Sequence, residues 1–403
     1  MAASTCLRVR WYFRLANDLG ERIGAARLPA LQLDSARLME IAREKTGLSD
    51  FGDDGFREGL EVFVNSLLHD ADLSPIGRIG IRGMIVTLLS NRLRVAEARR
   101  REPSRFESTL NPPVVITGTP RSGTTFLHRL LAEDGSFRTL PLWRLFKPVS
   151  RDPEGAVRRE VDRTLWLRRR LTPHLDRKHF VRSDSAEECI WLMNTSFTSH
   201  GLWVAAPVYG YLEWLGKQDR NLAYREYVEL LRYFQSEQPD RCFLLKAPSH
   251  AGSLEALQDA LPAVRIVQLH RDPVEVCSSL CSLFATLHSA VTRRLDLKRL
   301  GRTTLNLLLQ ESKRNLAARC KLVRPVLDIR YPDLLADPLA TVKTIYGYLG
   351  SDWDRALEER IVRHLRDHPQ GRHGRHLHDL ATFGLSRQEI VRLFAPYRRA
   401  LGL

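Results

Sequence analysis

One loop of the sequence has the residue types and spacing of an anion-binding site. The run Val114–Ile116 is apolar and β-branched, the loop Gly118–Thr125 is rich in glycine, proline and hydroxyl side chains, and apolar residues at helical spacing follow. This pattern predicts a strand, a tight loop and the start of a helix. Such a loop directs free backbone N–H groups and the positive end of the helix dipole at one point, where a phosphate or sulfate would bind.

The spacing of this loop resembles a Walker A nucleotide-binding loop, because Gly118 and Gly123 are five positions apart. The lysine of that motif is absent, and Thr124 stands in its place. A nucleotide kinase or NTPase is therefore the weaker alternative. A tight turn that binds no ligand is the other alternative for the loop taken alone.

Two further predicted strands lead to a cation. The apolar run 241–246 ends at Lys246, and Arg271 follows the apolar run 264–269 after a single residue. Ligands of open α/β sheets bind beyond the carboxyl ends of the strands. We therefore expect Lys246 and Arg271 to lie near Arg121 of the loop.

The elements that would position these residues predict an α/β fold. Residues 1–110 read as an N-terminal helical segment packed on the core, and residues 111–403 alternate strands with helices around a central parallel sheet. A helical insertion is expected at about 144–238. Outside the motifs we predict helices at 31–45, 56–68, 73–101, 157–171, 185–197, 253–261, 273–287 and 338–349, and a strand at 326–331.

Composition limits the class of partner. The chain has 403 residues and a formal net charge of +15, which favours an anionic ligand, an anionic membrane surface or nucleic acid. A non-enzymatic binder of nucleic acid or membrane is thus a third hypothesis. We expect no nucleic-acid partner, because no RNP, zinc-finger or helix-turn-helix signature is present. Peripheral contact with an anionic membrane stays open.

The cysteines and the hydropathy predict a cytoplasmic protein. The six cysteines are scattered without a CxxC pair, which suits reduced thiols better than a disulfide framework. No signal peptide and no apolar run of membrane-spanning length is expected from the sequence. No metal site is expected either, since the histidines near residue 373 fit no common zinc spacing.

Taken together, the three strand-end motifs resemble those of the sulfotransferases that use 3′-phosphoadenosine 5′-phosphosulfate (PAPS), especially the bacterial branch with a Pro-Arg-Ser-Gly-Thr-Thr loop. The resemblance runs from about Leu31 to the C-terminus and includes Gly47–Gly55, Tyr331–Pro338 and Phe383–Leu385. It implies a P-loop-like sulfotransferase fold. It also implies transfer of a sulfuryl group from PAPS to a hydroxyl or amine, with PAP as the product and no metal.

The resemblance also assigns roles to residues. Arg121 and Lys246 would stabilise the leaving phosphate during an in-line displacement. The 5′-phosphosulfate would be bound by the loop residues Thr119, Pro120, Arg121, Ser122, Gly123, Thr124 and Thr125. The 3′-phosphate would be bound by Arg271 and Ser279. Further contacts to the nucleotide would come from Tyr331, Arg372 and Arg375.

The general base and the acceptor are less closely defined. Many relatives carry a Trp-Glu pair after the helix of the loop, but here Arg144 follows Trp143, so that carboxylate is missing. The candidates for the base are, in order, His179, His250 and Glu188. The aromatic stretch Trp203–Trp214 is either ordinary core or the wall of an apolar pocket. The second reading suggests a small-molecule, lipid or glycan acceptor.

Overall fold

The architecture comes from a computed structural model that describes residues 11–22, 24, 28, 31–172, 181–368 and 379–403. Its centre is a five-stranded sheet in the order β2-β3-β1-β4-β5, in which every neighbouring pair is parallel. The predicted α/β class with a central parallel sheet is thereby confirmed. The strands are β1 (Val114–Gly118), β2 (Phe137–Arg138), β3 (Cys242–Lys246), β4 (Arg265–His270) and β5 (Val326–Arg330).

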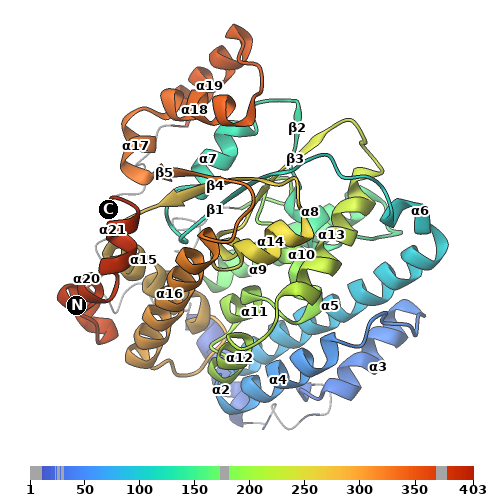
Figure 1. Cartoon of the computed structure of the whole chain (residues 1–403). Coiled ribbons are helices and arrows are strands. Elements are labelled where there is room, and N and C mark those ends of the chain that lie inside the picture. The colour runs from blue at the N-terminus through green and yellow to red at the C-terminus, as the bar shows by residue number, and fades with distance from the viewer. Residues whose placement is uncertain (1–10, 23, 25–27, 29–30, 173–180, 369–378) are drawn as a thin grey trace.

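The sequence of β1 explains its place at the centre of the sheet. All five of its residues are buried, as expected for a parallel strand covered on both faces. Val114 and Ile116 face a core shared with α7, α18 and α19, while Val115 faces a core shared with α13 and α14. Figure 1 shows these two groups of helices on opposite sides of the sheet. The helices are α7 (Thr124–Leu131), α13 (Asn221–Gln235), α14 (Leu254–Ala260), α18 (Pro338–Leu349) and α19 (Arg355–Asp367).

Two of the N-terminal helices, α3 and α5, begin at a residue whose side chain caps them. Asp34 accepts a hydrogen bond from the Arg37 N–H at 2.8 Å, and Ser74 accepts one from the Gly77 N–H at 3.0 Å, which satisfies donors that a helix start leaves open. Helices α3, α4 and α5 share one hydrophobic core with helices from much later in the chain, while Phe106 of α6 belongs to the core around α13. The bounds are α2 (Trp11–Arg22), α3 (Ser35–Thr46), α4 (Phe56–His69), α5 (Pro75–Arg101) and α6 (Pro103–Phe106), with the later partners α11 (His200–Ala205), α12 (Tyr209–Leu215), α15 (Pro273–Ser289), α16 (Leu297–Arg319) and α20 (Arg387–Leu393).

One predicted helix is wrong in its extent. Residues 185–189 are not helical, and only α10 (Ile190–Met193) and the 3-10 turn η4 (Asn194–Ser196) are. The backbone of this segment bonds elsewhere: the Leu142 N–H donates to Ser185 O at 2.9 Å, and the Cys189 N–H donates to Lys246 O at 3.0 Å. Tertiary bonds to α8 (Leu142–Phe146) and β3 thus replace the helical ladder, and Glu188 lies before the helix.

The remaining elements complete the layers. Strand β2 was not predicted, since two residues are too few to show a strand period.

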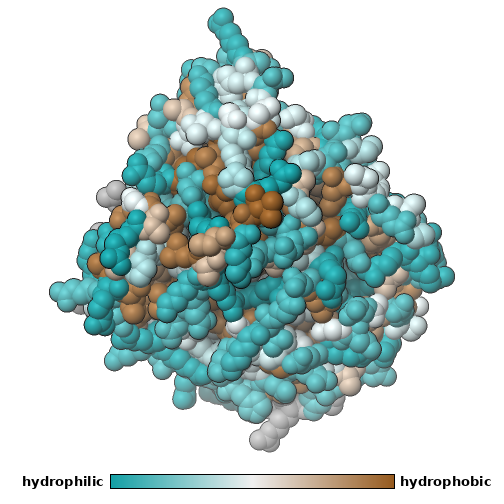
Figure 2. All heavy atoms as spheres, in the orientation of Figure 1, coloured by the Kyte–Doolittle hydropathy of each residue, from teal (hydrophilic) through white to brown (hydrophobic). Residues whose placement is uncertain are grey.

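Figure 2 shows that hydrophilic residues cover most of one face, with apolar residues gathered at the level of the sheet below α18 and α19. Within the described part of the chain, no helix has both the length and the apolar character needed to cross a membrane. The elements still to be placed are α9 (Glu154–Leu171), η5 (Pro248–Gly252), α17 (Tyr331–Ala336), η6 (Leu380–Phe383) and α21 (Ala395–Ala400).

Candidate active site

The loop between β1 and α7 forms a tight cradle at the carboxyl edge of the sheet. Gly118 has φ +143° and lies against the backbone of Leu269 on β4, so that no Cβ would fit there. Gly123 has φ +93°, and a Cβ on it would lie 2.8 Å from the Tyr331 ring. Arg121 itself has φ +70°, a left-handed conformation that non-glycine residues rarely adopt. These three residues therefore form a sharp turn, which would let the backbone of the loop approach a bound ligand closely.

The donors inside this cradle suit an anion. The first backbone bond of α7 runs from the Leu127 N–H to Gly123 O, so the N–H groups that precede it in the helix point out of its N-terminus. The hydroxyls of Thr119 and Ser122 in the loop are buried, and no other described residue hydrogen-bonds to them. Buried polar groups normally have partners. These donors therefore fit a phosphate or sulfate group in the cradle.

Lys246 adds a second cation beside the loop, which has Thr124 at the position of the Walker lysine. Its side chain is fully buried, and its Nζ donates to the Thr125 Oγ1 at 3.3 Å and to the Glu188 Oε1 at 3.0 Å. The pairing of Ile116 with Lys246 in the sheet places this ammonium beside the start of α7. A strand neighbour thus provides a charge at the loop, in a chain whose Walker lysine position holds Thr124.

Arg271 and Ser279 form a second polar cluster beside the loop. The Arg121 Nε donates to the Ser279 Oγ at 3.1 Å, and an Arg271 Nη donates to the Arg121 carbonyl at 2.9 Å. The Arg271 guanidinium lies 4.4 Å from the centroid of the Tyr331 ring, a cation–π arrangement. The structure thus brings Arg121, Arg271, Ser279 and Tyr331 together, and their roles in binding a nucleotide stay predictions.

The electrostatics of these two arginines favour a bound anion. Desolvation by its surroundings and, after that, the positive charge of Arg271 lower the pKa of Arg121. Arg271 is balanced on its other side by Glu275, whose carboxylate accepts from the Arg271 Nε at 2.8 Å. An anion between the two guanidinium groups would relieve their mutual repulsion.

Glu188 is the described carboxylate that lies at the cradle. It pairs with Lys246, whose side chain is fully buried, and its own side chain is 26% exposed, so an incoming group can reach the carboxylate from outside. The extended segment before α10 holds it there: the Glu187 N–H donates to Leu140 O at 3.1 Å, and the next residue but one, Cys189, bonds to β3. Glu188 thus faces the same point as the loop donors.

His250 occupies a different environment. It is fully buried, and its two ring nitrogens lie 2.7 Å from the Tyr224 hydroxyl and 3.3 Å from the Cys189 Sγ. Burial lowers the pKa of His250 to about 4, so the ring is neutral at physiological pH. His250 therefore links α13 to the residue that follows Glu188, rather than pointing at the open edge.

Some predicted site residues cannot be placed. His179, Arg372 and Arg375 lie outside the described residues. Sequence reasoning in turn missed Glu275, which lies four residues after Arg271 in the first turn of α15 and pairs with it. It also missed the hydrogen bond from the Thr117 hydroxyl to Ala247 O at 2.9 Å, which joins the ends of β1 and β3.

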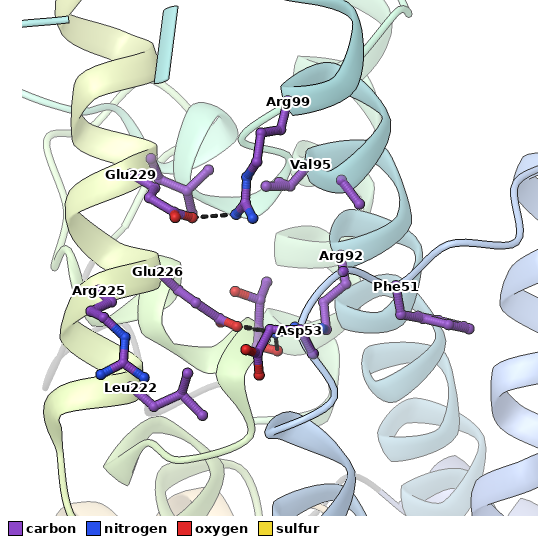
Figure 3. A pocket seen from close by; sticks show the side chains of 13 residues that line it. Phe51, Asp53, Arg92, Val95, Arg99, Leu222, Arg225, Glu226 and Glu229 are labelled. Atoms are coloured by element: carbon purple, nitrogen blue, oxygen red, sulfur yellow. Dashed lines mark hydrogen bonds and ion pairs between the residues drawn. The ribbon is translucent and has the colours of Figure 1, made fainter. Parts of the chain in front are cut away.

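A separate cavity of about 120 Å³ lies between α5, α13 and the turn at residues 51–53, and none of the site residues lines it. Figure 3 shows the Arg92–Glu226 and Arg99–Glu229 ion pairs spanning this space. The Arg92 Nη1 also donates to Thr195 O at 2.9 Å. Charge pairs across this cavity therefore fasten the N-terminal helices to the chain that precedes β3.

The aromatic stretch is mainly core. Trp203 and Tyr211 are fully buried, and the Trp203 ring packs against Tyr209, Phe284 and His288. Of the two readings given to Trp203–Trp214, the structure supports ordinary packing for these two residues. They do not line the cradle.

A parallel α/β sheet with a glycine-rich cradle, and with cations brought to it from neighbouring strands, is the arrangement found in proteins that bind phosphate- or sulfate-bearing ligands at the carboxyl edge of the sheet. The comparisons give the family. A model of the sulfotransferase family matches residues 112–355, and the chain belongs to this family. The predicted family is thereby confirmed.

Solved structures and a curated relative agree with this assignment. Sulfotransferase STF9 from Mycobacterium avium is 26% identical with a TM-score of 0.83, covering 92% of this chain and 97% of that one. Sulfotransferase STF1 from Mycobacterium tuberculosis H37Rv is 27% identical with a TM-score of 0.77, covering 90% and 98%. The omega-hydroxy-beta-dihydromenaquinone-9 sulfotransferase Stf3 of Mycobacterium bovis is 23% identical over 273 residues, which are 64% of this chain and 68% of that protein.

Proposed function

We propose that the chain transfers the sulfuryl group of PAPS to a hydroxyl group of a lipid-like acceptor. The observation that carries this proposal is the pair of adjoining anion subsites at one sheet edge. The loop and Lys246 make the first subsite, and Arg271 with Ser279 makes the second. PAPS carries a phosphosulfate at one end of its ribose and a phosphate at the other. Two distinct anion subsites suit it better than ATP, whose phosphates form a single chain.

The chemistry asks little of the protein beyond position and charge. The acceptor oxygen forms a bond to sulfur while the bond between sulfur and the phosphate oxygen breaks, and PAP leaves with added negative charge. In this proposal Lys246, Arg121 and the N–H groups of α7 would stabilise that charge. The loop and Arg271 would fix the donor so that attack occurs in line.

We assign the general base to Glu188 among the described candidates. Its carboxylate lies 3.0 Å from the Lys246 Nζ and is partly exposed, so an acceptor hydroxyl could reach it and lose its proton to it. Both nitrogens of His250 contact other buried groups, which supports a positioning role for that ring. His179 stays a prediction.

The acceptor class is inferred from a relative. The mycobacterial relative Stf3 is named for a hydroxylated dihydromenaquinone acceptor, which is a lipid-like molecule. We extend that class, and not the particular molecule, to this chain. A cytoplasmic location is part of the proposal, and the unpaired thiols of the described cysteines suit that reducing compartment.

Calorimetric titration of the full chain with PAP and with ATP tests the donor. We expect PAP to bind more tightly than ATP, and Arg271→Ala to lose PAP binding by at least about 30-fold, since a charge-assisted contact of about 2 kcal/mol disappears. Arg330→Ala is the matched control, because it removes an exposed arginine at the end of the neighbouring strand β5.

Equal or tighter binding of ATP, or unchanged PAP affinity in Arg271→Ala, would overturn the donor assignment. A urea unfolding curve for each variant separates loss of binding from loss of the fold. Labelled PAPS, offered with an extract of quinols and isoprenoid alcohols, tests the acceptor class. Label found only in water-soluble products would contradict it.

A further inference from the structure

Helix α9 (Glu154–Leu171) has a buried stripe and an opposite face with an unusual composition. Val157, Val161 and Leu165 recur every fourth residue, are buried, and share a small core with Leu142 and Trp143 of α8. This spacing keeps all three on one side of the helix. The stripe fixes which face of α9 must point away from the protein.

The outward face combines arginines with large apolar side chains. At about 100° per residue along the helix, five side chains lie within roughly 60° of the direction opposite Val161. All of them are exposed, Trp166 by 54% and Leu167 by 45%, and the Arg170 guanidinium lies 4.9 Å from the Trp166 ring centroid. The three acidic residues of the helix, at positions 154, 160 and 162, lie outside this face. The five exposed residues, called the α9 face below, are Arg159, Arg163, Trp166, Leu167 and Arg170.

We propose that the α9 face docks the protein on an anionic lipid bilayer. Arginine attracts anionic headgroups, and a tryptophan with a neighbouring leucine can enter the boundary between headgroups and acyl chains. Tryptophan prefers this boundary, because its ring is apolar while its N–H is polar. A nucleic-acid partner would account for the arginines but gives the exposed Leu167 no contact of its own. The net charge of +15 supports approach to such a surface.

The α9 face is structurally joined to the candidate active site. The Arg169 Nη2 on α9 donates to Val181 O at 2.7 Å, and the Trp143 N–H on α8 donates to Ser183 O at 2.9 Å. The same segment continues to Glu188 at the cradle. A bilayer that binds α9 would therefore lie against the part of the protein that carries the proposed base, which is α9, α8 and the segment from Val181 to Glu188. The choice of a bilayer rests in part on the proposed lipid-like acceptor.

Vesicle flotation with the full chain tests this surface directly. We expect binding to vesicles that contain phosphatidylglycerol, little binding to pure phosphatidylcholine, and loss of binding as salt rises. Neutralising two arginines by Arg163→Gln with Arg170→Gln should weaken binding about 30-fold, at about fivefold for each arginine near the surface. Trp166→Ala should weaken it by at least about fivefold through lost apolar burial.

The controls remove two arginines and trim one exposed apolar side chain elsewhere on the surface. Arg363→Gln with Arg366→Gln takes two exposed arginines from α19, and Val323→Ala trims a side chain that is 91% exposed. Both should bind vesicles as the unmodified chain does. If the control pair weakens binding as much as the α9 pair, attraction is a property of net charge and the proposal fails.

Two other results would also overturn the proposal. Binding to duplex DNA but not to vesicles, with the same dependence on the α9 arginines, would assign the face to nucleic acid. A doubled mass in solution that Trp166→Ala abolishes, without vesicle binding, would make it an interface between copies. PAP titration of the same samples is independent of α9, so failure of docking and failure of the donor assignment are told apart.

Discussion

Replacing Glu188 by glutamine should produce opposite effects on catalysis and on nucleotide affinity. In the free protein the Glu188 carboxylate neutralises the buried Lys246 ammonium at 3.0 Å. Removing one partner of a buried ion pair costs about 3–5 kcal/mol. Because Glu188 is 26% exposed and water screens part of the charge, we expect a loss of about 2 kcal/mol in the free energy of unfolding.

The same substitution should strengthen PAP binding. A bound phosphate would take over the charge on Lys246, so most of that 2 kcal/mol should return as affinity, about 30-fold. The rate of sulfuryl transfer should nevertheless fall by about 100- to 10,000-fold, because the proton acceptor is gone. Urea unfolding without ligand, calorimetric titration with PAP, and single-turnover transfer to the acceptor found by the extract screen measure the three quantities.

Glu275→Gln is the matched control for this prediction, because Glu275 pairs with Arg271 as Glu188 pairs with Lys246. It should raise PAP affinity slightly and leave the rate within about twofold, since an exposed pair is worth little. An unchanged rate in Glu188→Gln would show that Glu188 is not the base. Weaker PAP binding would show that its carboxylate does not compete with the donor phosphate.

Two other outcomes follow from the geometry. Gly123→Ala places a Cβ 2.8 Å from the Tyr331 ring at φ +93°; we expect PAP affinity to fall at least tenfold, at a strain of about 1–3 kcal/mol. Gly350→Ala, with similar backbone strain but no atom within 4 Å of the added Cβ, should cost stability alone, and equal PAP affinities in the two variants would count against the packing argument. Burial lowers the pKa of His128, His250 and His288 to about 4 each, whereas the pKa of a histidine in the unfolded chain is about 6.5. The neutral buried rings therefore stabilise the fold above pH 6.5, and this stability should be lost as pH falls from about 6.5 toward 4. Between pH 7 and 5 the free energy of unfolding should fall by about 2 kcal/mol per histidine. Urea midpoints across that range measure this loss, and a flat profile would refute it.

Much of the fold could be predicted because its signals are local. The run Val114–Ile116 and the loop after it carry their own periodicity and turn chemistry, and they appear as β1, the cradle and α7. The helix 338–349 was predicted at the bounds that α18 has. These elements depend on propensity, capping and burial pattern, which the residues themselves report.

The rest depended on tertiary contacts that no local pattern reports. Residues 185–189 have the composition of a helix start, yet their backbone bonds to α8 and β3 instead. That exchange determines where Glu188 lies. The position of His250 near Lys246 in sequence suggested a place at the site, but the turn of η5 directs its ring toward Tyr224. Lys246 and His250 thus lie close together in sequence, but their side chains contact different parts of the structure.

The cradle is assembled from strands that meet only in the folded sheet. Arg121 and Ser279 are 158 positions apart along the chain, and the Tyr331 ring beneath Gly123 comes from beyond β5. Contacts at such separations form late in folding, after loop-closure entropy has been overcome. No fragment that lacks β4 or the start of α17 can contain the whole site. Nucleotide binding should therefore report completion of the sheet during folding, and a bound nucleotide should slow the opening of its β5 edge.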